Sequence, residues 1–185
     1  MTDTSPAVNI DSTFATERLL LRPPTPHDVE FVLDLYSRHE VVQYIGRGEA
    51  QTSRGQAVKR IERYRAQFTG SLGVWLIERQ SDHPPAGFVL MKPIPFSEGF
   101  ESDETHIEIG WHLHPDAWGS GIATEAAHAL IDHARTNGIG HLVAVTHAHN
   151  LASQAVARRL GMTYEGPTDR YYNTTCELFS LNLTA

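Results

Sequence analysis

The sequence has a single cysteine, Cys176, in 185 residues, so no disulfide can form within the chain. Cys176 lies in the strand-like run 174–183, and we interpret it as a small hydrophobic residue rather than a nucleophile. Apolar runs of membrane-spanning length are missing as well. The first fourteen residues have neither the basic start nor the apolar core of a secretory signal. We therefore expect a cytoplasmic protein with no membrane partner.

Positive charge is also scarce. The chain has 15 Lys and Arg residues against 22 Asp and Glu residues, a formal net charge of −7, which argues against a nucleic acid partner because nonspecific binding needs a basic surface. An acidic surface favours the approach of a cation such as an amine, without demonstrating one. Hydrophobic residues (41%) and charged residues (20%) are in the usual balance for a globular domain. We predict a flexible tail over residues 1–15 and one domain over 16–185.

Hydrophobic periodicity and turn residues predict one sheet with helices packed on it. The order along the chain is β, α, α, β, β, β, α, β, α, β, β, which indicates a mixed α/β layer. The first helix is expected to start at Thr25 and to bury one face, made of Val29, Val32, Leu33 and Tyr36. The expected strands are 18–22, 72–78, 86–92, 105–113, 142–146, 162–165 and 174–183, and the other helices are about 51–68, 119–138 and 150–161.

The predicted strand 105–113 alternates between two faces and leads toward a glycine-rich turn. One face carries Ile107, Ile109, Trp111 and Leu113, and the other carries His106, Glu108, Gly110 and His112. The following helix is expected to bury Ala123, Ala127, Leu130 and Ala134 and to expose Glu125, His128, Asp132 and Arg135.

Gly119 and Gly121 stand one residue apart where that helix begins. Glycines at such a place let successive backbone N–H groups converge, and with the helix dipole they make a site for a phosphate or diphosphate. A tight strand-to-helix turn that merely needs glycine is the other interpretation. A P-loop is excluded because Gly121 precedes Ile122 and Ala123, and a dinucleotide fingerprint is excluded because its third glycine is replaced by Thr124. Coenzyme A remains as a diphosphate ligand.

Residues 118–125 (WGSGIATE) resemble the acetyl-CoA pyrophosphate loop of GNAT N-acetyltransferases, whose pattern is Gln/Arg-x-x-Gly-x-Gly/Ala. With Trp118 as its first residue, this run resembles the corresponding motif of the RimJ/RimL-like branch, the ribosomal-protein N-terminal acetyltransferases. Further matches to that branch are ERLLLRP at 17–23, EIGW at 108–111, NLAS at 150–153 and RLGM at 159–162. The resemblance covers roughly residues 16–183.

The resemblance implies the GNAT fold, a mixed and mostly antiparallel sheet of about seven strands with helices on both faces. It implies transfer of an acetyl group from acetyl-CoA to a primary amine by direct attack, without a metal. The cofactor residues that it implies are Trp111, His112 and Leu113 along the pantetheine arm, Trp118, Gly119, Ser120, Gly121, Ile122, Ala123 and Thr124 around the diphosphate, and Asn150 and Ser153 on the next helix.

Proton transfer requires two further groups, because a primary amine is protonated at neutral pH and a thiolate leaves. We select Glu108 as the general base; its other interpretation is a solvated or ion-paired strand carboxylate. Where many GNAT enzymes carry a catalytic tyrosine this chain has Ala157, so Ser153 is the candidate acid, equally well interpreted as a helix-packing serine. The alternative donors are Tyr164, Tyr171 and Tyr172. The histidine pairs His112/His114 and His147/His149 lack the further ligands of a metal site.

The acceptor amine is not specified by any motif. The branch resemblance points to a protein N-terminus, but small amines are also substrates in this branch, and the segments expected to bind the acceptor are 41–70, 93–103 and 167–175. The missing tyrosine leaves open a second function, a GNAT-like module that binds acyl-CoA as a sensor or regulatory subunit. A homodimer is expected by resemblance to the family.

Overall fold

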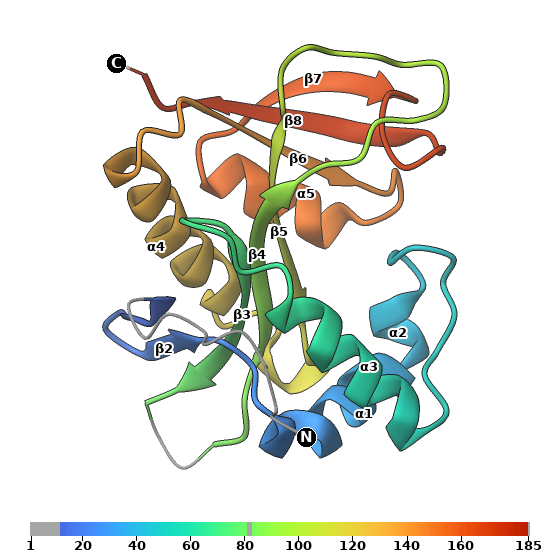
Figure 1. The fold of residues 1–185 in the computed structure, drawn as a ribbon, viewed down its shortest axis with the longest axis vertical. Helices are drawn as coiled ribbons and strands as arrows, with labels where there is room; N and C mark the ends of the chain where they lie inside the picture. Colours follow the sequence, from blue (N-terminus) through green and yellow to red (C-terminus); the bar gives the residue numbers. More distant parts are fainter. Residues whose placement is uncertain (1–11, 81–82, 185) are drawn as a thin grey trace, which may run out of the picture.

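The computed structural model describes residues 12–80 and 83–184, and within them the chain forms one eight-stranded sheet of order β1-β2-β3-β4-β5-β6-β8-β7 (Figure 1). The strands are β1 (Phe14–Ala15), β2 (Leu19–Arg22), β3 (Gly73–Arg79), β4 (Gly87–Pro93), β5 (Ile107–Leu113), β6 (His141–Thr146), β7 (Thr163–Thr168) and β8 (Cys176–Asn182). Every pair is antiparallel except β5 and β6.

Five α-helices accompany the sheet in the described part of the chain: α1 (Val29–Ser37), α2 (His39–Val42), α3 (Arg54–Arg65), α4 (Ile122–Thr136) and α5 (Leu151–Arg159). Short 3₁₀ turns precede α1 (Pro26–Asp28) and α4 (Pro115–Ala117). Figure 1 shows α4 and the α1–α3 group on opposite sides of the central strands. None of these helices is long and apolar enough to cross a bilayer.

The mixed, mostly antiparallel sheet with helices on both faces confirms the predicted fold class, but two short elements escaped the sequence patterns. Strand β1 lies in the segment assigned to the tail and pairs with Leu20 and Leu21; residues 1–11 of the predicted tail are outside the described residues. Helix α2 lies in a stretch to which the sequence patterns assigned no element. A strand of two residues and a helix of four are too short to show a repeating pattern of apolar residues. Because β1 was not predicted, the sheet has one strand more than expected.

The two largest hydrophobic clusters of the described residues lie on the two faces of the sheet. The first is roofed by α4 and α5, and the predicted inner face of α4 is buried there: Ala123, Ala127, Leu130 and Ala134. Alanine at these positions allows the helix to pack close to the strands. The second core joins α1, α2 and α3 to β3 and β4. In α1 the prediction was wrong at one position, because Leu35 is fully buried whereas Leu33 is only partly covered.

The feature that positions the site is the divergence of β5 and β6. Their parallel pairing is confined to one register position, Glu108 opposite Val143. Beyond it β5 continues to Leu113 and β6 to Thr146 without a shared ladder among the described residues. Two neighbouring strands that separate in this way leave a cleft between them, at the edge where the glycine turn and the start of α5 are located.

Candidate active site

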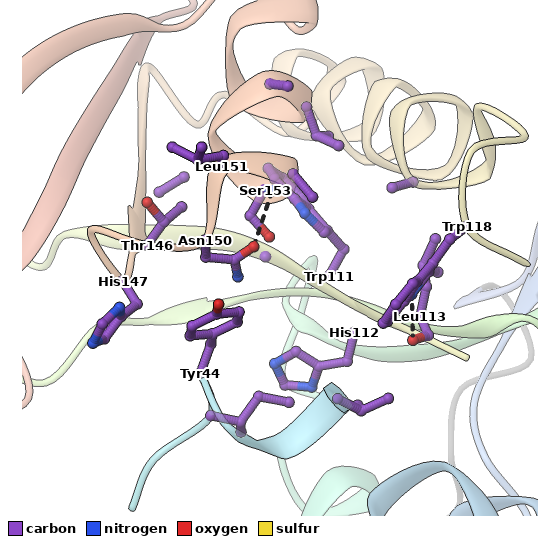
Figure 2. Close-up of a pocket in the computed structure, with 18 of the residues that line it drawn as sticks. Tyr44, Trp111, His112, Leu113, Trp118, Thr146, His147, Asn150, Leu151 and Ser153 are labelled. Carbon is purple, nitrogen blue, oxygen red and sulfur yellow. Dashed lines mark hydrogen bonds between the residues drawn. The ribbon is translucent and has the colours of Figure 1, made fainter. Parts of the chain in front are cut away.

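A cleft of about 880 Å³ opens between the diverging strands. Its walls come from β5, β6, the start of α4 and the first turns of α5, and α2 with the residues after it lies across the cleft from α5 (Figure 2). Apart from Ser120, all the residues expected to bind cofactor or to catalyse the reaction lie along this cleft: Glu108, Trp111, His112, Leu113, Trp118, Gly119, Gly121, Ile122, Ala123, Thr124, Asn150 and Ser153. Positions 45 residues apart in sequence are thus brought to one surface.

The glycine turn has the backbone that a diphosphate site requires. Gly119 and Gly121 have φ of 70° and 78°, the left-handed region, and Gly121 is the N-cap of α4. The six consecutive amides from Gly119 to Thr124 have no acceptor among the described residues, whereas the N–H of Glu125 already bonds the Gly121 carbonyl at 3.0 Å. Six free donors at the positive end of a 15-residue helix form an anion site.

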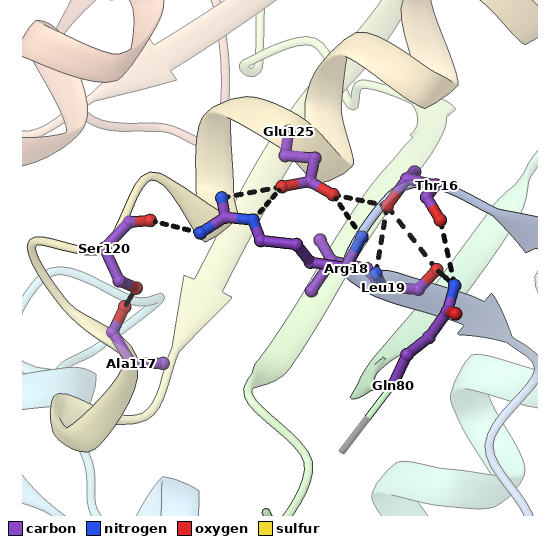
Figure 3. A network of polar contacts seen from close by, with 7 residues as sticks. All are labelled: Thr16, Arg18, Leu19, Gln80, Ala117, Ser120 and Glu125. Carbon is purple, nitrogen blue, oxygen red and sulfur yellow. Dashed lines mark hydrogen bonds and ion pairs between the residues drawn. The ribbon is translucent and has the colours of Figure 1, made fainter.

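The turn is held from behind by Arg18, at the start of the sheet (Figure 3). The Arg18 guanidinium donates to the Ser120 carbonyl at 3.0 Å and to Glu125 Oε2 at 2.6 Å. Glu125 Oε1 also accepts from the Thr16 hydroxyl and the Arg18 amide. Burial alone raises the pKa of Glu125, but these hydrogen bonds together lower it, which keeps the carboxylate charged. The expectation that Glu125 points to solvent was therefore wrong: it is half-buried and fixes the turn.

The opposite wall is the first turn of α5. The Asn150 side chain accepts from the Ser153 amide at 3.2 Å through Oδ1 (Figure 2), so it caps the helix as expected. That contact leaves the Asn150 Nδ2 group available to the cleft. Thr146, at the end of β6, has a buried hydroxyl with no partner among the described residues. An orphan hydroxyl in a ligand cleft is paired when an amide or carbonyl of a ligand reaches it.

Two further side chains border the mouth of the cleft. Trp118 is 50% exposed, and its indole N–H donates to the Leu113 carbonyl at 3.0 Å, so one carbonyl of the predicted pantetheine track is already taken. Arg159 lies within 3.4 Å of the Thr124 hydroxyl and brings a positive charge to the turn. The sequence showed Arg159 as part of a family motif but gave no sign of this position.

Glu108 is buried and lines the cleft at the position where β5 pairs with β6, which we call the far end of the cleft. Its Oε2 atom has two partners. Lys92 Nζ lies at 3.0 Å and the Tyr172 hydroxyl donates a short hydrogen bond to the same oxygen. Oε1 has no hydrogen-bond partner in the part of the chain that is described. The carboxylate is therefore ion-paired, as its alternative interpretation held, and it still lines the cleft.

Tyr172 reaches Glu108 through an unusual backbone. Tyr172 and Asn173 have φ of 60° and 53°, a left-handed conformation that non-glycine residues rarely adopt. Burial of the hydroxyl, followed by the neighbouring Glu108 charge, raises the pKa of Tyr172 far above its ordinary value, so it is a hydrogen-bond donor at neutral pH. No sequence signal marked this contact or the role of Lys92.

The other tyrosines considered as donors lie elsewhere. Tyr164 pairs with Glu177 on the exposed side of β7 and β8. Tyr171 is buried against His106, whose Nδ1 is 2.7 Å from its hydroxyl. Neither residue lines the cleft. Tyr44, which follows α2, does line it: its ring lies tilted against that of His147, with the ring centroids 5.3 Å apart (Figure 2).

Comparison with known proteins agrees with this geometry. Residues 18–163 match the family described as Acetyltransferase (GNAT) domain. YoaA of Bacillus subtilis, described as an uncharacterized N-acetyltransferase, is 28% identical over 161 residues, which cover 84% of this chain and 85% of the relative. The FsC-acetyl coenzyme A-N(2)-transacetylase of Aspergillus fumigatus is 26% identical over 174 residues, 90% of this chain and 72% of that protein.

A solved structure with the same fold is RimL, a ribosomal L7/L12 alpha-N-protein acetyltransferase in complex with coenzyme A. It superposes with a TM-score of 0.73 at 23% identity and covers 90% of this chain and 95% of its own. The family match spans most of the chain, including the glycine turn, both strands of the cleft and α5. The chain belongs to the GNAT acetyltransferase family and is an N-acetyltransferase that uses acetyl-CoA.

Proposed function

We propose that this protein transfers the acetyl group of acetyl-CoA to a primary amine by direct attack of the amine nitrogen on the thioester. The observation that carries the proposal is the row of six free amides, Gly119 to Thr124, at the mouth of a cleft that ends at a buried carboxylate, Glu108. Donors for a diphosphate at one end and a proton acceptor at the other are what this reaction needs.

The cofactor half of the cleft supplies the binding groups. The amides of residues 119–124, with Arg159 beside them, would hold the diphosphate. Nδ2 of Asn150 and the unpaired hydroxyl of Thr146 would meet the amide groups of the pantetheine arm. The main chain of Trp111, His112 and Leu113 forms the wall beside that arm, with Trp118 covering its end.

The far half supplies the proton-handling groups. The amine nitrogen bonds to the thioester carbon, one of its protons passes to Glu108 directly or through a water molecule, and the carbon–sulfur bond breaks. Because Lys92 and Tyr172 both engage Oε2, the Oε1 atom is the one available to accept. The Ser153 hydroxyl, which lines the cleft and has no partner among the described residues, donates a hydrogen bond to the departing thiolate. The Tyr172 hydroxyl, which already donates to Glu108, is the alternative donor.

Two acceptor classes fit the relatives. RimL is described as an alpha-N-protein acetyltransferase and the Aspergillus relative as an N(2)-transacetylase, and both names describe transfer of an acetyl group to a nitrogen. An α-amine of a peptide or a small primary amine is therefore the acceptor class we propose. A non-catalytic acyl-CoA sensor is the second candidate, favoured only by Ala157 in place of the family tyrosine.

The test is release of free coenzyme A thiol from acetyl-CoA against a panel of N-terminal peptides, amino acids and polyamines. We expect thiol release only when an acceptor is present, with mass spectrometry showing one added acetyl group. Calorimetry with coenzyme A runs in parallel. Binding without acetylation of any acceptor would favour the sensor, and absence of both would reject the proposal altogether.

A further inference from the structure

A buried chain of polar side chains leads from Arg60 on α3 to His112 at the wall of the cleft. The Arg60 guanidinium donates to the Tyr64 hydroxyl at 3.2 Å and stacks over the Tyr36 ring at 3.9 Å. The Tyr64 and Tyr36 hydroxyls are 2.8 Å apart, and the Tyr36 hydroxyl is 2.9 Å from His112 Nδ1. Tyr36 and Tyr64 are both buried, so each of their protons needs an acceptor within the chain.

Counting protons along these contacts fixes their direction. Arg60 has only donors, so Tyr64 must accept from it. The Tyr64 proton then has one described acceptor, the oxygen of Tyr36, and the Tyr36 proton has one, Nδ1 of His112. The reverse arrangement, in which Nδ1–H donates to Tyr36, would leave the Tyr64 hydroxyl proton buried without a partner. Every donor is satisfied only when the chain runs from Arg60 toward the histidine.

The ring of His112 therefore carries its single proton on Nε2. Burial, followed by the positive charges of Arg60 and Lys92, lowers the pKa of His112 from 6.5 to about 3, so the ring stays neutral at physiological pH. Nε2 has no partner among the described residues, and His112 lines the cleft between Tyr44 and Leu113 (Figure 2). A neutral imidazole held in one tautomer is a donor, not a base.

We propose that His112 Nε2–H donates a hydrogen bond to a carbonyl oxygen bound in the cleft, with its tautomer set by the Arg60–Tyr64–Tyr36 chain. The kinetic part of this proposal rests on the proposed acetyl transfer; the tautomer does not. A neutral donor suits an oxygen that becomes negative in the transition state, because it gives no proton away before the reaction. That oxygen belongs to the thioester or to a carbonyl next to the acceptor amine.

The first experiment measures the tautomer directly, on the whole protein without ligand. Long-range ¹H–¹⁵N spectra of the histidine rings show which nitrogen carries the proton, and the His112→Gln variant identifies the signal. We expect Nε2–H in the wild type and loss of that preference in Tyr36→Phe. Tyr171→Phe is the matched control, because Tyr171 makes the same hydroxyl–Nδ1 contact with His106 outside the cleft. Nδ1–H in the wild type, or an unchanged tautomer in Tyr36→Phe, overturns the proposal.

The second experiment compares two substitutions. Glutamine places an amide N–H near the Nε2 position of histidine, and asparagine places it near Nδ1. With acetyl-CoA and the best acceptor of the panel, we expect turnover of His112→Gln to exceed that of His112→Asn by at least tenfold. A difference in kcat assigns the oxygen to the thioester, and a difference in the KM of the acceptor assigns it to the acceptor. Equal activities of the two variants overturn the donor role.

If no acceptor is ever acetylated, the proposed function fails while the spectra still decide the tautomer. If transfer occurs but the tautomer is Nδ1–H, the function stands and this proposal fails. The two outcomes are thereby separable.

Discussion

The two proposed halves of the site are built from different parts of the chain. At the mouth, the proposed diphosphate donors are six main-chain amides from one contiguous run, residues 119–124. At the far end, the proposed chemistry relies on side chains from separate elements: Glu108 and His112 on β5, supported by Lys92 on β4 and by Tyr172 in the β7–β8 loop. The mouth depends on local backbone conformation, whereas the far end depends on tertiary packing.

This contrast explains why one end can be inferred from sequence. Glycines just before a helix predict free main-chain amides at that place, because the backbone conformation of the turn is set by residues that are neighbours in sequence. Nothing local announces that Tyr172 will meet Glu108. The division also predicts a division of effects: substitutions at the mouth change cofactor affinity, and substitutions at the far end change turnover and pH behaviour.

The largest effect is expected from Glu108→Gln, which removes the proposed proton acceptor and keeps the shape. We expect kcat to fall by about 10² to 10⁴ with the coenzyme A affinity unchanged, measured by thiol release and calorimetry. Glu177→Gln is the control, because Glu177 also accepts from a tyrosine hydroxyl but lies on the surface. A large loss of coenzyme A affinity in Glu108→Gln would contradict the prediction that substitutions at the far end change turnover and not cofactor affinity.

The next effect concerns acid stability. Because the pKa of His112 is lowered from 6.5 to about 3 in the folded protein, the unfolded chain binds one more proton between these values. The free energy of unfolding therefore falls as the pH drops through this window, by at most about 1.4 kcal/mol per pH unit from this residue. Denaturant unfolding at several pH values measures the slope. We expect a flatter slope in His112→Gln and an unchanged one in His128→Gln, at an exposed position of α4; equal slopes in all three proteins would contradict a buried neutral imidazole.

At the mouth, Gly121→Val forces a β-branched residue into the left-handed region, where it is strained by about 2 kcal/mol. We expect the main-chain N–H groups of the turn to change direction and the KM for acetyl-CoA to rise about thirtyfold. Gly138→Val is the matched control, because Gly138 has φ of 74° just beyond the other end of α4. Both variants lose stability, but only the first is expected to lose cofactor affinity. Equal affinities would show that the turn does not bind the diphosphate.

The smallest effect is expected from Arg18→Ala, which frees the glycine turn from the strand behind it. We expect the KM for acetyl-CoA to rise about fivefold with kcat nearly constant, since exposed ion pairs contribute about 1 kcal/mol or less. Arg135→Ala, which breaks an exposed pair with Asp132 elsewhere on α4, serves as control. A fall in kcat without a change in KM would place Arg18 in another role.

The sequence was sufficient for the fold class, the order of most elements and the location of the glycine turn before α4, because these depend on period, capping and glycine. It missed β1 and α2, which are too short to show a repeating pattern of apolar residues. It recognised the motifs that contain Arg18 and Glu125 but not the contact between these two residues, which are 107 positions apart, and it expected Glu125 to face solvent. Contacts of this kind, like the pairing of Glu108 with Lys92, exist only once the sheet is assembled.

The single register position that joins β5 to β6 has a consequence for handling the protein. Past that position the facing borders of both strands carry main-chain groups with no ladder partner in the described chain, and such borders are templates on which other polypeptides add as strands. Coenzyme A bound along them, as proposed, would cover these groups. We therefore expect concentrated samples kept without the nucleotide to self-associate first, and light scattering with and without coenzyme A measures this.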